Sequence, residues 1–348
     1  MELLAKPRIL ESLEEELRGT PRKWLVTGAA GFIGSNLVET LLSLDQHVTG
    51  LDNFSTGFAR NLDQILGLCS EEQRRRFAFV KGDIRNSEIC LQACEGQDVV
   101  LHQAALGSVP RSMEEPWNSH DSNVNGFLQI LLAVKKCGVS RLVYASSSSV
   151  YGDAPELPKK EEHQGNLLSP YALTKKMNEE LGDLFFRVYG VESLGFRYFN
   201  VFGPRQDPEG AYAAVIPRWF KAFWRGENPR IYGDGETSRD FCYIKNVVQI
   251  NLLGGTTTNP QALNQVYNVA VGERTTLNQL FELLRDQVAR FKPQAASAKP
   301  EYRDFRSGDV RHSLADISRA RELLGYEPQY SLRKGLEEAA SWYAANLV

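Results

Sequence analysis

Short apolar runs alternate with amphipathic stretches over the first two hundred residues of the chain. Contiguous apolar positions predict buried strands, and apolar positions that recur every three or four residues predict helices. The predicted strands are 23–29, 47–53, 77–83, 98–105, 141–147 and 192–200. The predicted helices are 32–44, 59–69, 87–96, 123–137 and 170–188. This alternation predicts an α/β fold whose doubly wound parallel sheet is covered by helices on both faces.

The regular alternation stops after residue 200. Glycine, proline and tyrosine become frequent around 203–213 and 228–240, as is typical of loops and short strands. We therefore expect a second, smaller α/β unit that is interleaved with the first. The expected division is a larger unit at 23–199, with 241–270 returning to it, and a smaller unit at 200–240 and 271–348.

Residues 1–22 precede the first predicted strand. Leu10, Leu13 and Leu17 are spaced for one face of a helix, but the segment is rich in glutamate and has no long apolar run. We expect a helical extension that packs on the outside of the domain, rather than a signal peptide or a transmembrane helix.

The overall composition narrows the classes of function. A net charge of -3 over 348 residues gives no general attraction to nucleic acid or to an acidic membrane. The cysteines number five, without a CxxC pair, and the five histidines are scattered. These features predict a cytoplasmic protein with neither a disulfide framework nor a metal site.

A glycine motif joins the first strand to the first helix. Gly28, Gly31 and Gly34 have G-x-x-G-x-x-G spacing in the segment WLVTGAAGFIGSNLVETLL. In a Rossmann fold such glycines permit a tight turn and a close approach of the pyrophosphate to the helix N-terminus. Phe32 and Ile33, which begin the helix, would line the same site. An ordinary strand–helix turn is the alternative for the glycines alone.

Asp52, at the end of the second strand, supports the nucleotide interpretation. A carboxylate about 20 residues after the glycines binds the adenosine ribose and repels a 2′-phosphate, which favours NAD over NADP. The ends of neighbouring strands would line the same cofactor. These residues are Asn53, Ser55, Gly57, Asp83, Ile84, Gln103, Ala104, Ala105 and Tyr198.

Tyr171 and Lys175 are the candidate chemical groups. They are four residues apart in SPYALTK, so both face one side of the predicted helix, which Ser169 and Pro170 are suited to begin. A nearby ammonium and a positively charged nicotinamide would favour the phenolate of Tyr171 and make it a usable base. Lys175 can also bind the nicotinamide ribose. An ordinary surface pair is the alternative.

Four consecutive serines follow the strand that precedes this helix. Strand side chains alternate faces, so not all four can point into one pocket. We expect Ser147 and Ser149 to share a face if the strand continues, with Ser148 available if it turns. A hydroxyl there could bond a substrate hydroxyl and then its ketone. A polar exit into a turn is the alternative.

The complete motif set resembles a known family. The segments are TGAAGFIG, Asp52-Asn53, GDI, HQAA, SSSSVYG, YALTK and RYFNVFGP. They resemble the extended short-chain dehydrogenase/reductases and, within these, the nucleotide-sugar 4-epimerases, most closely the bacterial UDP-N-acetylglucosamine 4-epimerases. The resemblance covers the chain from about residue 22 to its end.

The resemblance implies an isomerase with tightly bound NAD. In that family Ser147 would be the catalytic serine, Tyr171 the base and Lys175 its partner. The C4 hydride of a UDP-sugar passes to NAD, the 4-keto sugar rotates, and the hydride returns to the other face. The family default is a homodimer, for which helices 123–137 and 170–188 are the candidates, and a typical role is polysaccharide biosynthesis.

The resemblance also implies a substrate site. Gly107, Ser108 and the hydroxyls of Ser147, Ser148 and Ser149 would approach the hexose, and Asn200 would contact the diphosphate–sugar region. Ala214 and Val215 would line the uracil, while Arg239, Arg306 and Asp309 would hold the diphosphate and a ribose hydroxyl. Arginines suit a diphosphate, but surface salt bridges are their local alternative.

Ser313 determines the expected choice of sugar. Four residues after the aspartate of the R-x-G-D motif, the family has a residue that borders the hexose C2 group, and a small one leaves room for N-acetyl. We therefore expect interconversion of UDP-N-acetylglucosamine and UDP-N-acetylgalactosamine. The local alternative is a cap for a helix beginning near Asp316.

Other functions remain as alternatives at this point. A UDP-glucose or UDP-glucuronate 4-epimerase would use the same chemical groups. A nucleotide-sugar 4,6-dehydratase or decarboxylase would need a carboxylate where Ser148 and Ser149 stand, and an NAD-binding regulator would have lost the chemistry.

Overall fold

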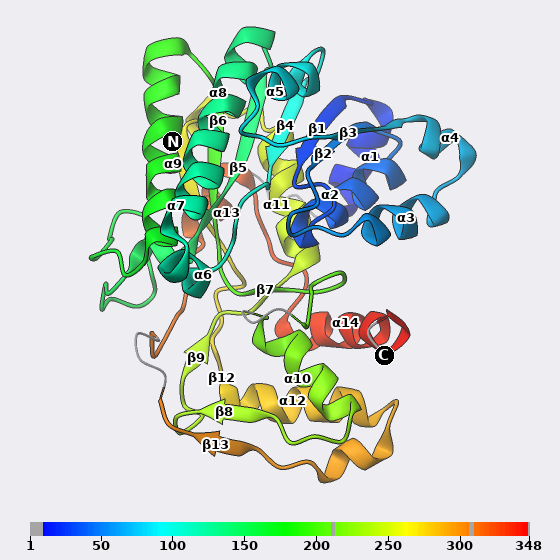
Figure 1. Ribbon diagram of the computed structural model, residues 1–348, viewed down its shortest axis with the longest axis vertical. Coiled ribbons are helices and arrows are strands. Elements are labelled where there is room, and N and C mark those ends of the chain that lie inside the picture. The colour runs from blue at the N-terminus through cyan, green and yellow to red at the C-terminus, as the bar shows by residue number, and fades with distance from the viewer. Residues whose placement is uncertain (1–9, 210–212, 306–309, 347–348) are drawn as a thin grey trace.

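Seven parallel strands form the main sheet of the computed structural model, which describes residues 10–209, 213–305 and 310–346 (Figure 1). The strand order is β11 (Gln265–Val269), β6 (Ser193–Tyr198), β5 (Arg141–Ser147), β4 (Val99–His102), β1 (Lys23–Thr27), β2 (His47–Asp52) and β3 (Phe77–Lys81). The order reverses between β1 and β4, and a crevice opens at the carboxyl ends of strands at such a point. The predicted doubly wound parallel sheet is confirmed.

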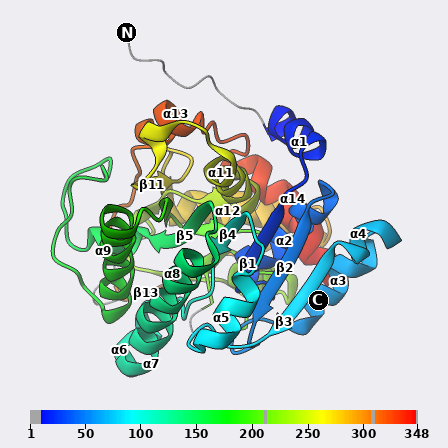
Figure 2. The same ribbon diagram turned by 90° about the horizontal axis from the view of Figure 1, so that it is seen from above.

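Alternate residues of each strand serve two separate cores. Trp24 and Val26 pack into the larger hydrophobic cluster, while Leu25 packs into the smaller one on the opposite face. Both faces are therefore apolar, as parallel sheets require. The larger cluster is covered by α1 (Leu10–Gly19), α2 (Phe32–Ser43) and α11 (Ile244–Thr256), and the smaller by α5 (Ser87–Cys94), α8 (Gly126–Cys137) and α9 (Pro170–Tyr189) (Figure 2).

The expected N-terminal helix is present as α1. Leu13 and Leu17, which are four residues apart on one face of this helix, are fully buried. The fully buried Gln46 donates to Leu17 O at 2.8 Å and accepts from Trp24 Nε1 at 3.2 Å. This amide joins the end of α1 to the first two strands.

The predicted strands are present but several are shorter than the apolar runs. β1 ends at Thr27 and β4 at His102, so Gly28 and Gln103 lie in the loops that follow. The helix expected at 123–137 begins as α8 at Gly126, after a π-helical turn at Asp121–Asn125. The polar residues at the strand ends are thus free to face the crevice rather than the sheet.

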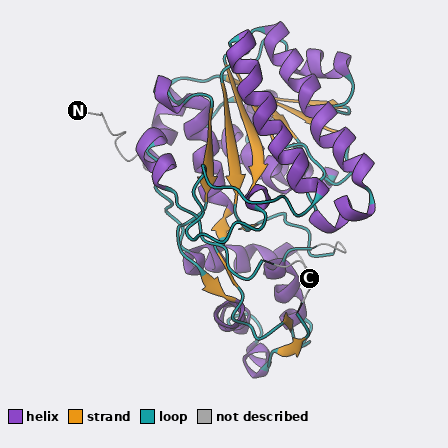
Figure 3. Ribbon diagram, turned by 90° about the vertical axis from the view of Figure 1, so that its left-hand side faces the viewer, coloured by secondary structure: helices purple, strands orange, loops and turns teal. Residues whose placement is uncertain are grey.

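A smaller α/β region lies beyond the carboxyl ends of the main sheet (Figure 3). Its helices α10 (Val215–Trp224) and α12 (Leu277–Ala289) pack through aromatic rings, with Phe223 and Phe281 centroids 5.0 Å apart. Three two-stranded sheets complete it. They are β7 (Val201–Phe202) with β10 (Cys242–Tyr243), β9 (Ser238–Arg239) with β12 (Thr275–Thr276), and β8 (Arg230–Tyr232) with β13 (Glu301–Arg303).

Six further α-helices complete the described part of the chain. They are α3 (Ala59–Leu68), α4 (Glu71–Arg75), α6 (Val109–Glu114), α7 (Pro116–His120), α13 (Ser318–Leu324) and α14 (Leu332–Asn346). Every helix in the part of the chain that the structure describes is too short or too polar to cross a lipid bilayer.

Candidate active site

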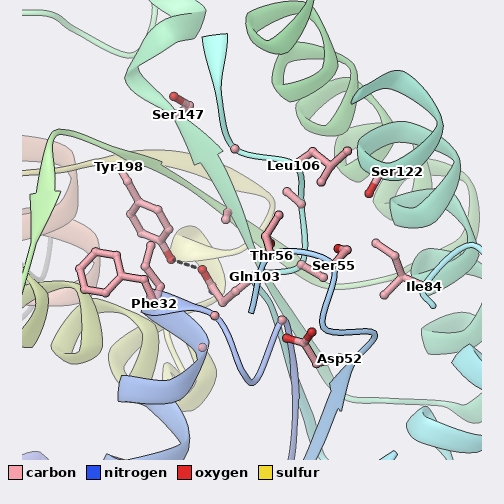
Figure 4. A pocket seen from close by; sticks show the side chains of 18 of the residues that line it. Phe32, Asp52, Ser55, Thr56, Ile84, Gln103, Leu106, Ser122, Ser147 and Tyr198 are labelled. Carbon is pink, nitrogen blue, oxygen red and sulfur yellow. Dashed lines mark hydrogen bonds between the residues drawn. The ribbon is translucent and has the colours of Figure 1, made fainter. Parts of the chain in front are cut away.

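A cavity of about 490 Å³ opens at the carboxyl ends of the central strands. It brings together most of the residues that the motifs predict, although they come from segments far apart in the sequence. The predicted residues that line it are Gly28, Gly31, Phe32, Ile33, Gly34, Asp52, Asn53, Ser55, Asp83, Ile84, Gln103, Ala104, Ala105, Gly107, Ser147, Tyr171, Lys175, Tyr198 and Asn200. In Figure 4, Ser147 and Asp52 lie toward opposite ends of the cavity.

Sequence reasoning missed nine further lining residues. They are Leu51, Thr56, Gly82, Leu106, Ser122, Ala145, Ser146, Val201 and Gln206. Most are sequence neighbours of predicted residues and could have been included on that ground. Ser122 could not, because it belongs to the π-helical turn, which has no readable sequence pattern.

The glycine turn has no room for side chains. Gly28 adopts φ of 69°, and its N–H donates to Leu51 O at 2.8 Å. A Cβ at Gly34 would lie only 2.0 Å from Gly28 O. The backbone can therefore approach a ligand closely where α2 begins, and the free N–H groups and positive end of this helix suit phosphates.

Asp52 is held by the backbone of two adjacent loops. Its carboxylate accepts from Ala30 N at 2.9 Å and from Phe54 N at 2.7 Å. These bonds fix a negative charge beside the glycine turn, where it can accept ribose hydroxyls and repel a 2′-phosphate. The donor and acceptor set therefore fits NAD.

An ion-pair chain borders the same end of the cavity. Arg85 donates to Asp83 and to Asp121, each at 2.8 Å, and Asn53 donates to Asp83 at 2.8 Å. The hydrogen bond from Arg85 is the largest reason that the pKa of Asp83 falls to about 2. Asp83 therefore stays ionised, and Arg85 links the loop after β3 to Asp121 of the π-helical turn.

Two polar side chains of the cavity wall, Tyr198 and Gln103, are hydrogen-bonded to each other and to Asn251 behind them. Tyr198 donates to Gln103 at 3.1 Å (Figure 4), and Asn251 of α11 donates to the Tyr198 hydroxyl at 2.9 Å. Burial raises the pKa of Tyr198 well above its ordinary value. Tyr198 is therefore a neutral packing and hydrogen-bonding group, whereas Tyr171 remains the candidate base.

Local sequence rules place the two chemical groups of α9. Ser169 caps the helix by accepting from Ala172 N at 3.1 Å, and Pro170 occupies its first turn. Tyr171 and Lys175 then face the cavity one helical turn apart. The Lys175 ammonium donates to Ala145 O at 2.8 Å and lies 6.0 Å from the centre of the Tyr171 ring.

Burial dominates the ionisation of both groups. It raises the pKa of Tyr171, and the hydrogen bond with Ser147 lowers it by less. Burial also lowers the pKa of Lys175 to about 8, which the Glu179 carboxylate partly opposes. The sequence led us to expect that Lys175 would favour the phenolate, but its ammonium bonds the β5 backbone rather than Tyr171. Ser147 is the group that lowers the Tyr171 pKa in this arrangement.

The four serines have different environments. Ser146 Oγ donates to the buried Glu179 at 2.6 Å, and Ser147 lines the cavity. β5 ends at Ser147, whose hydroxyl accepts from Ser149 N at 3.2 Å and begins a 3-10 helix at Ser148–Tyr151. The chain therefore turns, and the shared face expected for Ser147 and Ser149 in a continued strand is not formed.

Several predicted residues lie outside the cavity. Ser148 and Ser149 are in the 3-10 helix, Ser108 caps α6, Ala214 and Val215 begin α10, and Gly57 packs against Ala30 of the glycine turn. Arg306 and Asp309 lie outside the described residues. Ser313 donates its backbone N–H to Ser238 O at 3.0 Å. Its alternative role as a helix cap is wrong, because α13 begins at Ser318 after Ile317.

Cations gather around the β9–β12 pair. Arg239 donates to the carbonyls of Ser238 and Arg311, at 3.0 and 3.3 Å. Burial lowers the pKa of His312, and the nearby guanidiniums of Arg274, Arg311 and Arg239 lower it further. Arg311 also forms a salt bridge with Asp234 at 2.6 Å, so part of this positive charge is already paired.

Comparisons with known proteins identify similar chains. The model of the NAD dependent epimerase/dehydratase family matches residues 24–270. The UDP-glucose 4-epimerase of Mycolicibacterium smegmatis is 36% identical over 321 residues, which cover 92% of this chain and 97% of that protein.

Solved structures share the fold over 93% of the chain. The UDP-N-acetylglucosamine 4-epimerase of Methanobrevibacter ruminantium M1, in complex with UDP-N-acetylmuramic acid, is 36% identical with a TM-score of 0.85 over 93% of this chain and 99% of that one. The UDP-glucuronic acid 4-epimerase of Bacillus cereus, in complex with UDP-glucuronic acid and NAD, is 30% identical with a TM-score of 0.81 over 93% and 99% of the two chains.

Proposed function

Since the chain belongs to the NAD dependent epimerase/dehydratase family, we propose that it is a UDP-sugar 4-epimerase that prefers UDP-N-acetylglucosamine and UDP-N-acetylgalactosamine. The family membership confirms the resemblance to the extended short-chain dehydrogenase/reductases, and NAD is the cofactor of the family. The preference for N-acetylated sugars is our own inference.

One observation carries the proposal. Ser147, Tyr171 and Lys175 converge on one part of a cavity whose other end has the glycine turn and Asp52. A cofactor held by the phosphate and ribose groups would extend toward the three chemical side chains. When bound, NAD supplies a reversible two-electron acceptor for carbon 4 of the sugar.

Side chains of the protein would accept and return the proton of the sugar 4-hydroxyl. Tyr171 Oη would take the proton of the sugar 4-hydroxyl, directly or through Ser147 Oγ, and later return it. Ser147 can donate to a ketone and accept from a hydroxyl, so it can bond the sugar at both stages. Lys175 would hold the nicotinamide ribose and supply positive charge near Tyr171.

The preference for N-acetylated sugars rests on small side chains. Ser313 is small at the position that borders carbon 2 in the resemblance, and Gly107 leaves the opposing cavity wall open. An acetamido group offers both a donor and an acceptor, and the Ser147 hydroxyl on the cavity wall can bond either. Two of the similar proteins instead carry the names UDP-glucose and UDP-glucuronic acid 4-epimerase, which makes these sugars the competing substrates.

A matched set of substrates tests the proposal. The protein is incubated separately with UDP-N-acetylglucosamine, UDP-glucose and UDP-glucuronic acid, and products are separated by chromatography. We expect the C4 epimer of each accepted sugar, fastest for the N-acetylated one, and NAD(H) released on denaturation without added cofactor. A 4-keto-6-deoxy or decarboxylated product would indicate a dehydratase or decarboxylase, and absence of both product and NADH absorbance would indicate a regulator.

Residues implied for the diphosphate belong to the same proposal. Arg239 lies in the cation cluster, and Asn200 lines the cavity with φ of 32°, a conformation that asparagine tolerates. We propose that residues 23–199 and 241–270 hold the cofactor. We propose that residues 200–240 and 271–348 hold the UDP-sugar.

We also propose a homodimer formed through α8 and α9. These helices leave Leu132, Leu184 and Val188 exposed at 44%, 41% and 57%, and a partner subunit would bury them. Sedimentation equilibrium of the protein and of a Val188→Glu variant would test the dimer. A monomeric wild-type protein would contradict it.

A further inference from the structure

We infer that Glu179 is a positioning residue: it keeps the helix of Tyr171 and Lys175 in register with the strand end that carries Ser147. This inference rests on the proposed 4-epimerase function. It concerns a residue outside the cavity, because Glu179 does not line it.

Glu179 forms a buried, two-point ion pair. Arg197 of β6 donates from Nε to Glu179 Oε1 and from Nη2 to Oε2, each at 2.8 Å. Only 6% of Glu179 and 1% of Arg197 are exposed. The planar guanidinium and the two carboxylate oxygens fix one relative orientation, so the pair restricts how α9 can lie against the sheet.

The same carboxylate binds the serine strand. Ser146 Oγ donates to Glu179 Oε1 at 2.6 Å, and Ser146 directly precedes Ser147. One turn earlier, Lys175 donates to Ala145 O at 2.8 Å. The helix is therefore attached to two consecutive residues of β5 at the point where that strand enters the cavity.

Strand β6 is joined to α9 and β5 by the same ion pair. Arg197 lies opposite Ser146 in the parallel pairing of β5 and β6. It also donates from Nη1 to the Tyr151 hydroxyl at 3.0 Å and to Glu161 O at 2.9 Å. Glu179 is thus the residue through which α9 joins a network of both strands and the turn after the serines, and Lys176 of the same helix lies 3.8 Å from its carboxylate.

Spacing transmits this constraint to the chemical groups. Tyr171, Lys175 and Glu179 follow one another at intervals of four residues, so they share one face of α9. A shift of Glu179 relative to Ser146 moves Tyr171 relative to Ser147 by a similar amount. A misplacement of about 1 Å can cost on the order of 10²-fold in rate.

Glu179 also contributes charge. The titratable groups that interact with Lys175 come from two elements: Glu179 and Tyr171 of α9, and His102 of β4. Burial lowers the pKa of His102 to about 3, so this imidazole is neutral. The Glu179 carboxylate raises the pKa of Lys175, and its removal should move the loss of the ammonium to lower pH.

Three variants separate positioning from simple support of the fold. Glu179→Gln removes the charge at nearly the same shape. Glu179→Leu combined with Arg197→Leu removes the pair without leaving one buried charge unpaired, so it covers the case in which the first variant does not fold. Glu180→Gln is the control for loss of a carboxylate on α9, because Glu180 is exposed and bonds Lys176 at 2.8 Å, whereas Lys176 lies 3.8 Å from Glu179.

We expect kcat to fall by roughly 10- to 100-fold in both Glu179 variants, from the misplacement argument. KM for the UDP-sugar and the NAD(H) content should stay close to wild type, and the alkaline limb of the kcat profile should move to lower pH in Glu179→Gln. Turnover within about twofold of wild type would overturn the inference. A variant that loses both bound NAD(H) and most of its turnover, and whose remaining activity has an unmoved alkaline limb, would also overturn the inference. That result would mean that Glu179 only supports the fold.

The control keeps the two proposals distinguishable. If wild type and Glu180→Gln epimerise none of the three UDP-sugars, the proposed function fails. If both are active and the Glu179 variants are equally active, only the positioning role fails.

Discussion

Replacing Gly34 by alanine should remove cofactor binding, because this residue packs directly against the glycine turn. A Cβ at Gly34 would lie 2.0 Å from Gly28 O, and ordinary Cβ contacts begin near 3.4 Å. The turn and α2 would therefore have to separate by about 1.4 Å. Gly28 O has little freedom to move, since it also accepts from Gly31 N at 3.0 Å.

The size of the effect follows from this displacement. Overfilling a packed site typically lowers the free energy of unfolding by about 1–3 kcal/mol. The same movement displaces the N–H groups at the start of α2. A misplacement of about 1 Å can lower a rate on the order of 10²-fold, and we apply the same factor to the affinity for NAD. A 10²-fold weaker affinity for NAD corresponds to about 2.7 kcal/mol of binding free energy.

The assay compares Gly34→Ala with a matched glycine variant. In Gly67→Ala the new Cβ would have no neighbour within 4 Å, and the residue lies on the exposed side of α3. Each protein is denatured, and the released NAD(H) is measured by chromatography. Its thermal unfolding and its Kd for added NAD are measured in parallel.

The outcome shows whether the glycine turn binds the phosphates of NAD or is only an ordinary strand–helix turn. We expect Gly67→Ala to behave as wild type, while Gly34→Ala loses bound NAD(H) and epimerase turnover together. If Gly34→Ala retained stoichiometric NAD(H) with unchanged affinity, the turn would not be where the phosphates bind, and our reasoning about the motif would be refuted.

Three further predictions concern single groups. Tyr171→Phe should lower kcat by about 10²–10⁴-fold while isothermal titration still detects UDP-sugar binding, because the ring remains and only the base is lost; near-normal turnover would remove Tyr171 from that role. Ser313→Tyr should suppress turnover of the N-acetylated pair more than that of UDP-glucose, and equal loss of both would mean that Ser313 supports the fold. Burial raises the pKa of Asp240 to about 6, so the folded state binds this proton more tightly than the unfolded chain. The resulting stability, up to about 3 kcal/mol, should be complete below about pH 4 and lost as the pH rises through about 6. Asp240→Asn should abolish this dependence in denaturant titrations, and an unchanged profile would assign it to another group.

Much of the cofactor end could be predicted because its signals are local. The strand–glycine–helix sequence requires a tight turn, and Asp52 follows at the end of the next strand. Both features depend on backbone geometry and on period-two or period-3.6 patterns, which a short stretch of sequence contains. The cavity accordingly includes Gly28, Gly31, Gly34 and Asp52.

The serine run shows where local reasoning stops. Alternation along a strand predicts that Ser147 and Ser149 share a face, but β5 ends at Ser147 and the chain turns into a 3-10 helix. The strand ends where its last neighbour ends: β4 has already stopped at His102, opposite Tyr144, and β6 stops at Tyr198, opposite Ser147. A strand without hydrogen-bonding neighbours has no ladder to continue, and no feature of the serines themselves reports this.

The sequence by itself determined the main alternation of strands and helices, the glycine turn, the carboxylate at the end of β2 and the placement of Tyr171 and Lys175 on one helix face. These depend on residues within one or two turns of each other, whose geometry the covalent chain restricts. Only the tertiary structure decided that Ser146 binds Glu179, that Arg197 from a third element completes this pair, and that the Lys175 ammonium bonds the β5 backbone. Such contacts join segments separated by 18 to 33 residues, and burial, which depends on the packing of the whole molecule, sets their strength.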